Sequence, residues 1–299
     1  MNFEIMTLFP ELVDTVLSSS IIGRARSRGA LSVRVHNIRD YSADKHRRVD
    51  DTPYGGGMGM LMSAPPIYSC YRAIVDREDF SGRTRVVYMS PKGSLLNQKE
   101  AYRLAEYDNL IILCGHYEGI DQRIIDEIVD EEISIGDYVL TGGELPACIL
   151  VDCVGRLADG VLSSPECHEL ESFSCGLLEF PQYTRPYDFL GRKVPDVLLS
   201  GNHAEIARWR QEQALALTRT RRPDLLGRND NCNNERNNER NAGLHENRQK
   251  AALARGAAAK SAIADENSSD GENYDVPSLE GGDSSEKRAD SDSHKAPEN

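Results

Sequence analysis

The sequence predicts an α/β domain built around a mostly parallel sheet. Two observations support this fold class: short apolar runs rich in Val, Ile and Leu, and helical segments that alternate with them. The runs are FEIMTLF at 3–9, LSVRVHNI at 31–38, RVVYMS at 85–90 and NLIILCG at 109–115. The 299 residues are enough to bury a sizeable core.

Helices are expected between and after these strands. The chain enters a first helix directly after the first strand, and further helices are expected over 64–77 and 97–107. Asn97 is a suitable N-cap for the latter. Another helix is expected from Leu145, where Pro146 is acceptable because it lies in the first turn.

Beyond this domain the pattern changes twice. Residues 162–195 contain several prolines and show no periodicity, as expected of a linker. Residues 203–226 place Ile206, Trp209, Ala214 and Leu217 on one helix face and arginines on the other, which predicts a small helical domain. From Asn229 the composition is rich in Asn, Ser, Asp and Glu, so we expect a low-complexity, disordered tail.

Composition argues against a membrane protein and against a disulfide-rich secreted one. No run approaches the roughly 18 uninterrupted apolar residues of a membrane span, and the N-terminus lacks the pattern of a secretory signal. The seven cysteines form no CxxC pair and have no histidine pair at zinc-ligand spacing. We therefore expect reduced thiols in a cytoplasmic protein that has no membrane partner.

Charge alone does not decide the partner. The formal net charge of −13 argues against nucleic acid. The tail from Asn229 holds 15 acidic and nine basic side chains, so it carries −6 and residues 1–228 carry −7. Basic side chains nevertheless cluster at 24–28, 45–48, 208–210 and 219–222. Such clusters occur both on solvated faces and on RNA-binding surfaces.

Glycine-containing segments follow the predicted strands. They are PYGGGMGMLM at 53–62, RVVYMSPKG at 85–93, LCGHYEGID at 113–121 and SIGDYVLTGGELP at 134–146. The first lacks the context of a dinucleotide fingerprint, so it is either a flexible surface loop or a backbone cradle for phosphate. The other three lie at strand ends, where open α/β sheets bind ligands and where glycine leaves room for a planar ring.

Five segments in order resemble the bacterial tRNA (guanine-37-N1)-methyltransferase family, TrmD. They are VDDTPYGGGMGMLM, GHYEGID, SIGDYVLTGGELPA, PQYTRP and VLLSGNHAEIARWR. The resemblance implies a SPOUT-class α/β fold whose C-terminal portion forms a trefoil knot, and a homodimer. It divides the chain into a knotted cofactor-binding domain (1–161), a linker with a catalytic segment (162–195), a helical tRNA-binding domain (196–228) and the tail (229–299).

The resemblance also implies S-adenosylmethionine as the methyl donor, held by the three glycine-containing strand ends. The implied cofactor-binding residues are Tyr88, Ser90, Pro91, Gly115, Tyr117, Glu118, Ile135, Gly136, Asp137, Tyr138, Val139, Leu140, Gly142 and Gly143. Mg²⁺ is a second cofactor associated with the family. No oxygen cage is evident in the sequence, so we assign no metal ligand, although one or two carboxylates could hold a hydrated ion.

Methylation of guanine at N1 sets the catalytic requirements. The N1 proton must be removed by a base, the charge that develops on O6 needs a cation, and the guanine must leave its stack. The family's arginine corresponds to Arg156. The family's base is an aspartate, and the matching residue here is Glu171, one methylene longer; Glu169 is a second candidate. His116 occupies a position where arginine is also common, and we assign it no role.

The implied substrate is the anticodon stem-loop of a tRNA with guanine 37. Tyr183, Arg185, Arg208 and Arg210 are the expected RNA contacts, whereas Trp209 is expected in the core. Two alternatives remain open. A catalytically impaired SPOUT-fold RNA-binding protein is favoured only by the glutamate at 171. A related knotted methyltransferase acting on ribosomal RNA or on a ribose 2′-hydroxyl would not need the long C-terminal helical segment.

Overall fold

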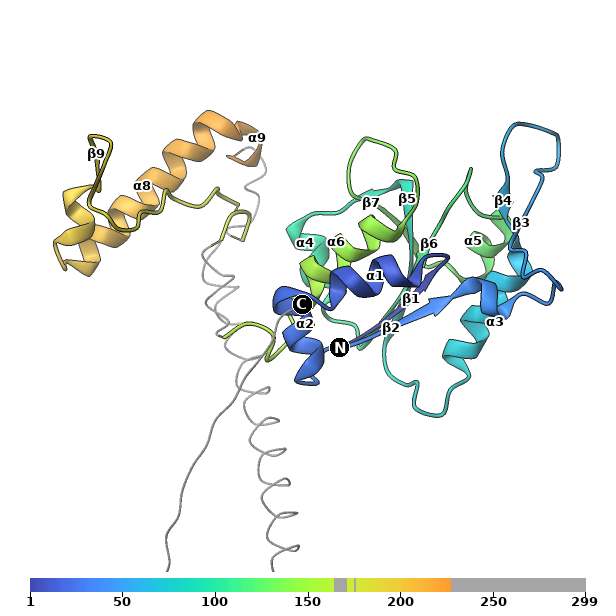
Figure 1. Cartoon of the computed structure of the whole chain (residues 1–299). Helices are drawn as coiled ribbons and strands as arrows, with labels where there is room; N and C mark the ends of the chain where they lie inside the picture. Colours follow the sequence, from blue (N-terminus) through green and yellow to red (C-terminus); the bar gives the residue numbers. More distant parts are fainter. Residues whose placement is uncertain (164–170, 175, 227–299) are drawn as a thin grey trace, which may run out of the picture. The chain divides into compact units, whose positions relative to one another are not determined.

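The computed structural model describes residues 1–163, 171–174 and 176–226. Residues 1–163 form an α/β domain around a five-stranded sheet in the order β2-β1-β6-β5-β7 (Figure 1). Each neighbouring pair of strands in this sheet is parallel. The predicted fold class, a mixed α/β domain with a parallel central sheet, is therefore confirmed. The expected disordered tail lies outside the described residues.

The four predicted strands all lie in this sheet, and a fifth joins them. The strands are β1 (Asn2–Thr7), β2 (Ser32–Asn37), β5 (Thr84–Leu95), β6 (Asn109–Cys114) and β7 (Glu131–Ser134). The sequence analysis did not predict β7, because only Ile133 among its four residues is apolar and two glutamates precede it. Its pairing with β5 shifts register between Met89 and Ser94, where β5 bends past the end of the sheet.

Helices connect the strands. They are α1 (Pro10–Leu17), α2 (Ser20–Ser27), η1 (Ile38–Tyr41), α3 (Ala64–Val75), α4 (Gln98–Leu104), α5 (Gln122–Ile128) and α6 (Glu144–Gly155). Those predicted near 64, 97 and 145 are present, and Asn97 caps α4 by accepting a hydrogen bond from the backbone N–H of Glu100. The short helices α2 and α5 were not predicted, since two turns give too little periodicity to recognise.

The sheet is buried on both faces. Along β6, Leu110, Ile112 and Cys114 enter one hydrophobic cluster, and Ile111 and Leu113 enter the other. This alternation follows from the two-residue period of a strand. The first cluster also contains residues of α1, α2, α4 and α6, and the second contains residues of η1, α3 and α5. The domain therefore has three layers, with the sheet in the middle.

A small antiparallel pair lies outside the main sheet. Strands β3 (Asp50–Asp51) and β4 (Leu61–Met62) pair with each other and flank the glycine-rich loop at 53–59. The backbone N–H of Glu118 donates to the carbonyl of Met60 at 3.1 Å, and that of Met62 donates to the carbonyl of Gly119 at 3.0 Å. The base of this loop is therefore fixed to the segment that follows β6.

The C-terminal segment carries its own short elements. They are β8 (Asp188–Phe189), β9 (Arg192–Lys193), η2 (Asp196–Leu199), α8 (His203–Arg221) and α9 (Pro223–Leu226). The predicted helix near 203–226 is thus present, and Asn202 caps it. Its apolar stripe buries Ala214, and Trp209 packs against Tyr183 with ring centroids 6.3 Å apart. None of the described helices combines the length and apolar character that a bilayer span requires.

One buried carboxylate links β1 to its neighbours. The side chain of Glu4 is 1% exposed and pairs with Arg34 at 3.3 Å, His36 at 2.6 Å and Arg77 at 2.5 Å. Burial alone would raise the pKa of Glu4, but the hydrogen bonds from His36 and Arg77 outweigh it and lower this pKa below 4.5. The ionised carboxylate therefore stabilises the fold through its three partners.

Glu4→Gln should lower the free energy of unfolding by about 3 kcal/mol, because it leaves the basic partners without their counter-charge. Since the folded-state pKa lies below the ordinary 4.5, the contribution of Glu4 is present above that pH and is lost as the pH falls through the folded-state value. Urea unfolding between pH 3 and 7 measures both effects. The exposed Glu11→Gln is the control, and an equal pH dependence in both variants would contradict the assignment.

Candidate active site

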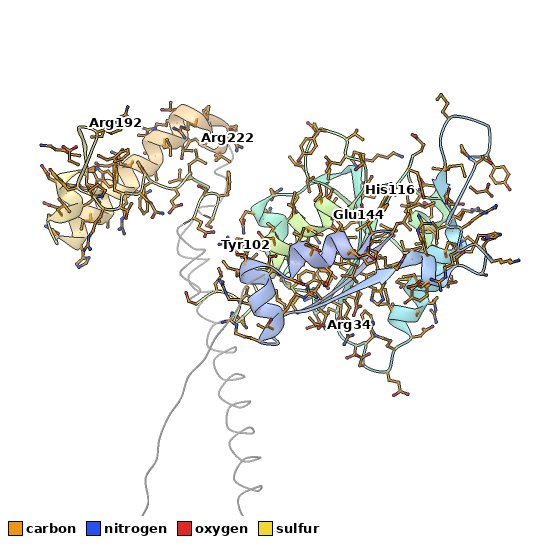
Figure 2. The ribbon with its side chains drawn as sticks, in the orientation of Figure 1. Arg34, Tyr102, His116, Glu144, Arg192 and Arg222 are labelled. Carbon is orange, nitrogen blue, oxygen red and sulfur yellow. The ribbon has the colours of Figure 1, made fainter. Side chains whose placement is uncertain are left out.

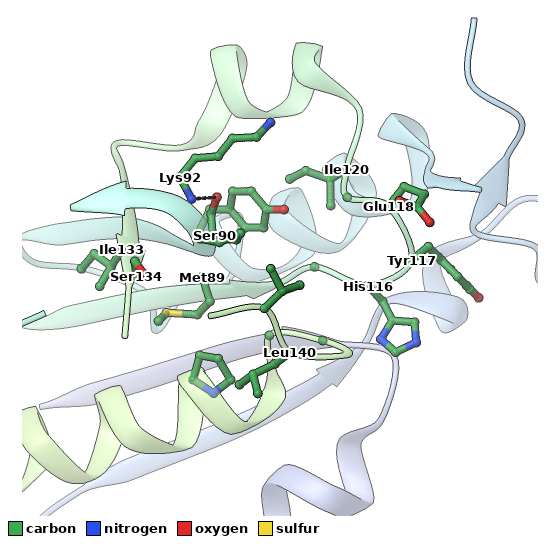
Figure 3. A pocket seen from close by; sticks show the side chains of 18 of the residues that line it. Met89, Ser90, Lys92, His116, Tyr117, Glu118, Ile120, Ile133, Ser134 and Leu140 are labelled. Atoms are coloured by element: carbon green, nitrogen blue, oxygen red, sulfur yellow. Dashed lines mark hydrogen bonds between the residues drawn. The ribbon is translucent and has the colours of Figure 1, made fainter. Parts of the chain in front are cut away.

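A cavity of about 290 Å³ lies where β5, β6 and β7 end and α6 begins (Figure 3). Three segments form its walls: residues 88–92, residues 115–120 and residues 133–143. Figure 3 shows Ile133 and Ser134 toward one end of the cavity and His116, Tyr117 and Glu118 toward the other. The cavity therefore occupies the carboxyl edge of the parallel sheet, where the sequence analysis expected ligand-binding loops.

The first wall is the end of β5. Tyr88 is buried, and this burial, together with the nearby Glu132, raises the pKa of its hydroxyl to about 12. The phenol therefore stays neutral and can donate or accept a hydrogen bond. Beyond it the hydroxyl of Ser90 accepts a hydrogen bond from the backbone N–H of Lys92 at 3.2 Å, which holds the bend in the chain.

The second wall follows β6. A Cβ atom on Gly115 would lie 2.8 Å from the Tyr88 hydroxyl oxygen, so this position excludes any side chain while Tyr88 keeps its place. Tyr117 has a φ of +59°, a conformation that is uncommon for a residue other than glycine. Arg39 of η1 donates a hydrogen bond to the Tyr117 hydroxyl at 3.3 Å, which helps to hold this turn.

The third wall leaves β7 and returns across the end of β6. The Ser134 hydroxyl donates to the carbonyl of Gly136 at 3.0 Å and shapes the first turn. At the far end, the backbone N–H of Gly143 donates to the carbonyl of Gly115 at 2.8 Å. A Cβ atom on Gly143 would lie 2.8 Å from the Cα of Cys114, so only glycine permits this approach. Two of the three walls are thus joined by backbone contacts.

The whole described α/β domain and the segment after it match a single family model. The model is that of tRNA (Guanine-1)-methyltransferase TrmD, and the match extends over residues 1–228. The chain belongs to the TrmD family. Relatives named tRNA (guanine-N(1)-)-methyltransferase agree with this assignment.

Three of these relatives show how much of the chain is shared. The protein of Ruminiclostridium cellulolyticum is 57% identical over 233 residues, which cover 78% of this chain and 99% of the relative. That of Lachnospira eligens is 56% identical over 225 residues (75% and 94%). That of Clostridioides difficile is 53% identical over 225 residues (75% and 97%).

The cavity of this TrmD-family chain gathers nearly all the residues expected to bind the cofactor. Every one of them lines the cavity except Asp137, whose side chain is exposed on the same loop. The cavity also includes side chains that the sequence analysis did not assign, among them those of Met89, Lys92, His116 and Ile120. Met89 and Lys92 adjoin assigned residues along β5. Their positions in the expected loop could therefore have identified them as lining residues.

Arg156 and Glu171, the two expected catalytic residues, form an ion pair. Arg156 follows the last residue of α6, and its guanidinium donates two hydrogen bonds to the Glu171 carboxylate, at 2.5 and 2.6 Å. The hydrogen bond from Arg156 to Glu171 raises the pKa of the guanidinium. The alternative base, Glu169, lies outside the described residues.

The residues expected to contact RNA lie along the C-terminal segment. Tyr183 and Arg185 are exposed, and Arg208 is exposed 3.9 Å from Glu212 on the next turn of α8. Arg210 covers the ring of Phe180, with the guanidinium carbon 4.9 Å from the ring centroid. Arg210 therefore has a packing role within this segment in addition to any contact with a partner.

Among the described residues, no group of three or more His, Cys, Asp or Glu side chains lies close enough together to hold a metal ion.

Proposed function

We propose that this chain transfers a methyl group from S-adenosylmethionine to N1 of guanine 37 in tRNA, next to the anticodon. The observation that carries the proposal is the match to the TrmD family over residues 1–228, together with a cavity at the predicted loops. The relatives named above are tRNA (guanine-N(1)-)-methyltransferases, and more than half of their aligned residues are identical to those of this chain.

The cavity suits a cofactor that combines a planar base with a short polar chain. Its walls provide backbone donors and acceptors at Gly115, Gly136, Gly142 and Gly143, and apolar surface from residues such as Leu140. Bound there, S-adenosylmethionine would supply an electrophilic methyl group. The neutral hydroxyl of Tyr88 would donate a hydrogen bond within this cavity, because burial keeps its proton in place.

The Arg156–Glu171 pair suits the edge of guanine that must react. Guanine presents an N1–H donor next to its O6 acceptor, which complements a carboxylate beside a guanidinium. Glu171 would accept the N1 proton, and Arg156 would stabilise the negative charge that develops on O6. The bidentate pairing supports an active enzyme over an impaired RNA-binding protein, because the longer glutamate side chain still reaches the arginine.

We also propose the knotted topology and the homodimer of the SPOUT class. The return of the 135–143 segment from the edge strand β7 to Gly115 supports the knot. The distance between the cavity and the Arg156–Glu171 pair supports the dimer. Pro146 lines the cavity, whereas Arg156 comes ten residues later, directly after α6, which corresponds to about 15 Å at the rise of an α-helix. A second protomer could bring its own Arg156–Glu171 pair to the cavity.

An exposed apolar face indicates where the protomers would meet. On α1, Leu12 and Val16 are 42% and 45% exposed; on the adjoining α6, Leu145 and Ile149 are 51% and 46% exposed.

The proposed tRNA contacts are Tyr183, Arg185, Arg208 and Arg210. No step of the reaction is assigned to a metal ion.

Replacing Leu12 and Val16 together by lysine should convert the protein from dimer to monomer, because two charges would enter an apolar contact. Sedimentation equilibrium measures the change. Glu11→Lys, on the same helix but turned away from this face, is the matched control and should stay dimeric. A wild-type protein that is monomeric at micromolar concentration would contradict the dimer.

Transfer of labelled methyl groups to tRNA transcripts tests the function directly. A transcript with guanine at position 37 should be labelled, and the same transcript with adenine there should not, because adenine would present its N1 lone pair to the Glu171 carboxylate and its N6 amino group to the Arg156 guanidinium. Equal labelling of both transcripts would refute the guanine assignment. Absence of S-adenosylmethionine binding by calorimetry would favour the non-catalytic alternative.

Glu171→Gln should lower the single-turnover rate of methyl transfer at least 100-fold, since the general base is lost. Cofactor affinity should stay within a factor of two, because Glu171 does not line the cavity. Glu179→Gln in the same segment is the control. An unchanged rate in Glu171→Gln would remove this residue from the mechanism.

A further inference from the structure

His116 carries an unusual polar atom at the edge of the cavity. It directly follows Gly115 and lines the cavity, and its ring is held between Phe9 and Tyr117, with ring centroids 5.0 and 4.9 Å away. Its Nδ1 atom is buried and has no hydrogen-bond partner in the described part of the chain. Leaving a buried polar atom unpaired costs free energy, so such an atom requires an explanation.

Glu144 is the counterpart of this atom. It begins α6 and is 5% exposed, and its Oε1 atom accepts a hydrogen bond from the buried Thr7 hydroxyl at 2.8 Å. It lies in the first turn of α6, where the helix dipole is positive. Among the described residues, no Lys, Arg or His nitrogen lies within 4.0 Å of this carboxylate.

Gly142 lies between the two groups. A Cβ atom added there would fall 2.3 Å from Oε2 of Glu144 and 2.7 Å from Nδ1 of His116. Since both distances start from one point, the two side-chain atoms are at most 5.0 Å apart. The backbones of His116 and Gly142 already form an antiparallel bridge. Figure 2 labels the two side chains next to each other in the α/β domain.

We propose that His116 and Glu144 form a proton-dependent latch across Gly142, which joins two cofactor loops and so sets the affinity for the methyl donor. This inference rests on the proposed function and adds its regulation by pH. Both residues are positioning residues: Glu144 lies behind the cavity wall, and His116 acts through the loop that it anchors.

The protonation state decides whether the latch closes. With a neutral imidazole whose Nδ1 is unprotonated, a lone pair faces the carboxylate and the two groups repel. When the ring takes up a second proton, Nδ1–H can donate to Oε2 of Glu144 through a small rotation of either side chain. The resulting charge-assisted hydrogen bond would join residues 115–118 to residues 142–144.

The other titratable groups nearby do not change charge near neutral pH. Burial, together with Glu144, raises the pKa of the Cys148 thiol to about 11 and that of Cys114 well above its usual range. Arg39, which contacts Tyr117, stays cationic. Glu118 on the same loop is exposed. Among these groups, an imidazole is the one whose ordinary titration range covers pH 5 to 8.

Calorimetric binding of S-adenosylmethionine to the full-length protein between pH 5.5 and 8.5 tests the latch. The dissociation constant of the wild type should rise about tenfold across this range as the charge-assisted bond is lost. His116→Arg carries a permanent cation and should bind with nearly the same affinity at both ends. Glu144→Gln should also lose the dependence, because its amide can donate to an unprotonated Nδ1.

Asp152→Asn is the matched control, since it removes an exposed carboxylate from the same helix and should keep the wild-type pH dependence. A pH-independent wild-type affinity, or an unaltered pH dependence in His116→Arg, would overturn the latch alone. No binding at any pH would overturn the proposed function, and the latch with it.

A second measurement does not depend on how the variants fold. Long-range ¹H–¹⁵N spectra of the wild type report the protonation of each imidazole nitrogen. His116 should show a protonated Nδ1 at pH 5.5 in the presence of S-adenosylmethionine. An unprotonated Nδ1 under these conditions would contradict the proposal.

Discussion

The close approach of Gly143 to the end of β6 is the constraint on which the site depends. The 2.8 Å hydrogen bond from the Gly143 N–H to the Gly115 carbonyl brings the segment after β7 back across the sheet. That return closes the cavity and starts α6 directly beside it. It also places Glu144 next to Thr7 at the end of β1. The ends of three strands and the start of one helix thus lie close together, and the adjacent glycines permit this close packing of the backbone.

Much of this arrangement could be predicted from the sequence. Buried parallel strands have short, nearly continuous apolar runs, so β1, β2, β5 and β6 were identifiable, and glycine at strand ends indicated the ligand-binding edge. The edge strand β7 could not be identified, because it is four residues long and half acidic. The family resemblance supplied Arg156 and Glu171, whose contact depends on a chain path that no local pattern encodes. His116 was given no role, since an unpaired atom is visible only in three dimensions.

The site separates two electrostatic tasks along one helix. At the start of α6 a buried carboxylate lies beside a cavity that suits a cationic cofactor. Beyond its end a guanidinium and a carboxylate pair with each other, and guanine could take the place of each group as the partner of the other. Separation along α6 keeps the two sets of charges from neutralising each other, and this separation is the ground on which the dimer is proposed. The rigid link between them is a helix whose buried face includes Leu150, Val151 and Val154.

The glycines in the cavity walls also affect how readily resistance to an inhibitor of this site could arise. At Gly115 and Gly143 any larger residue would meet Tyr88 or the backbone of Cys114. A compound that hydrogen-bonds to the main chain at these two positions contacts groups that a substitution cannot remove without disturbing the wall itself. Resistance would then have to arise at cavity side chains without this constraint, such as Lys92, or through export and expression. Selection experiments with such compounds should therefore yield few changes at Gly115 and Gly143.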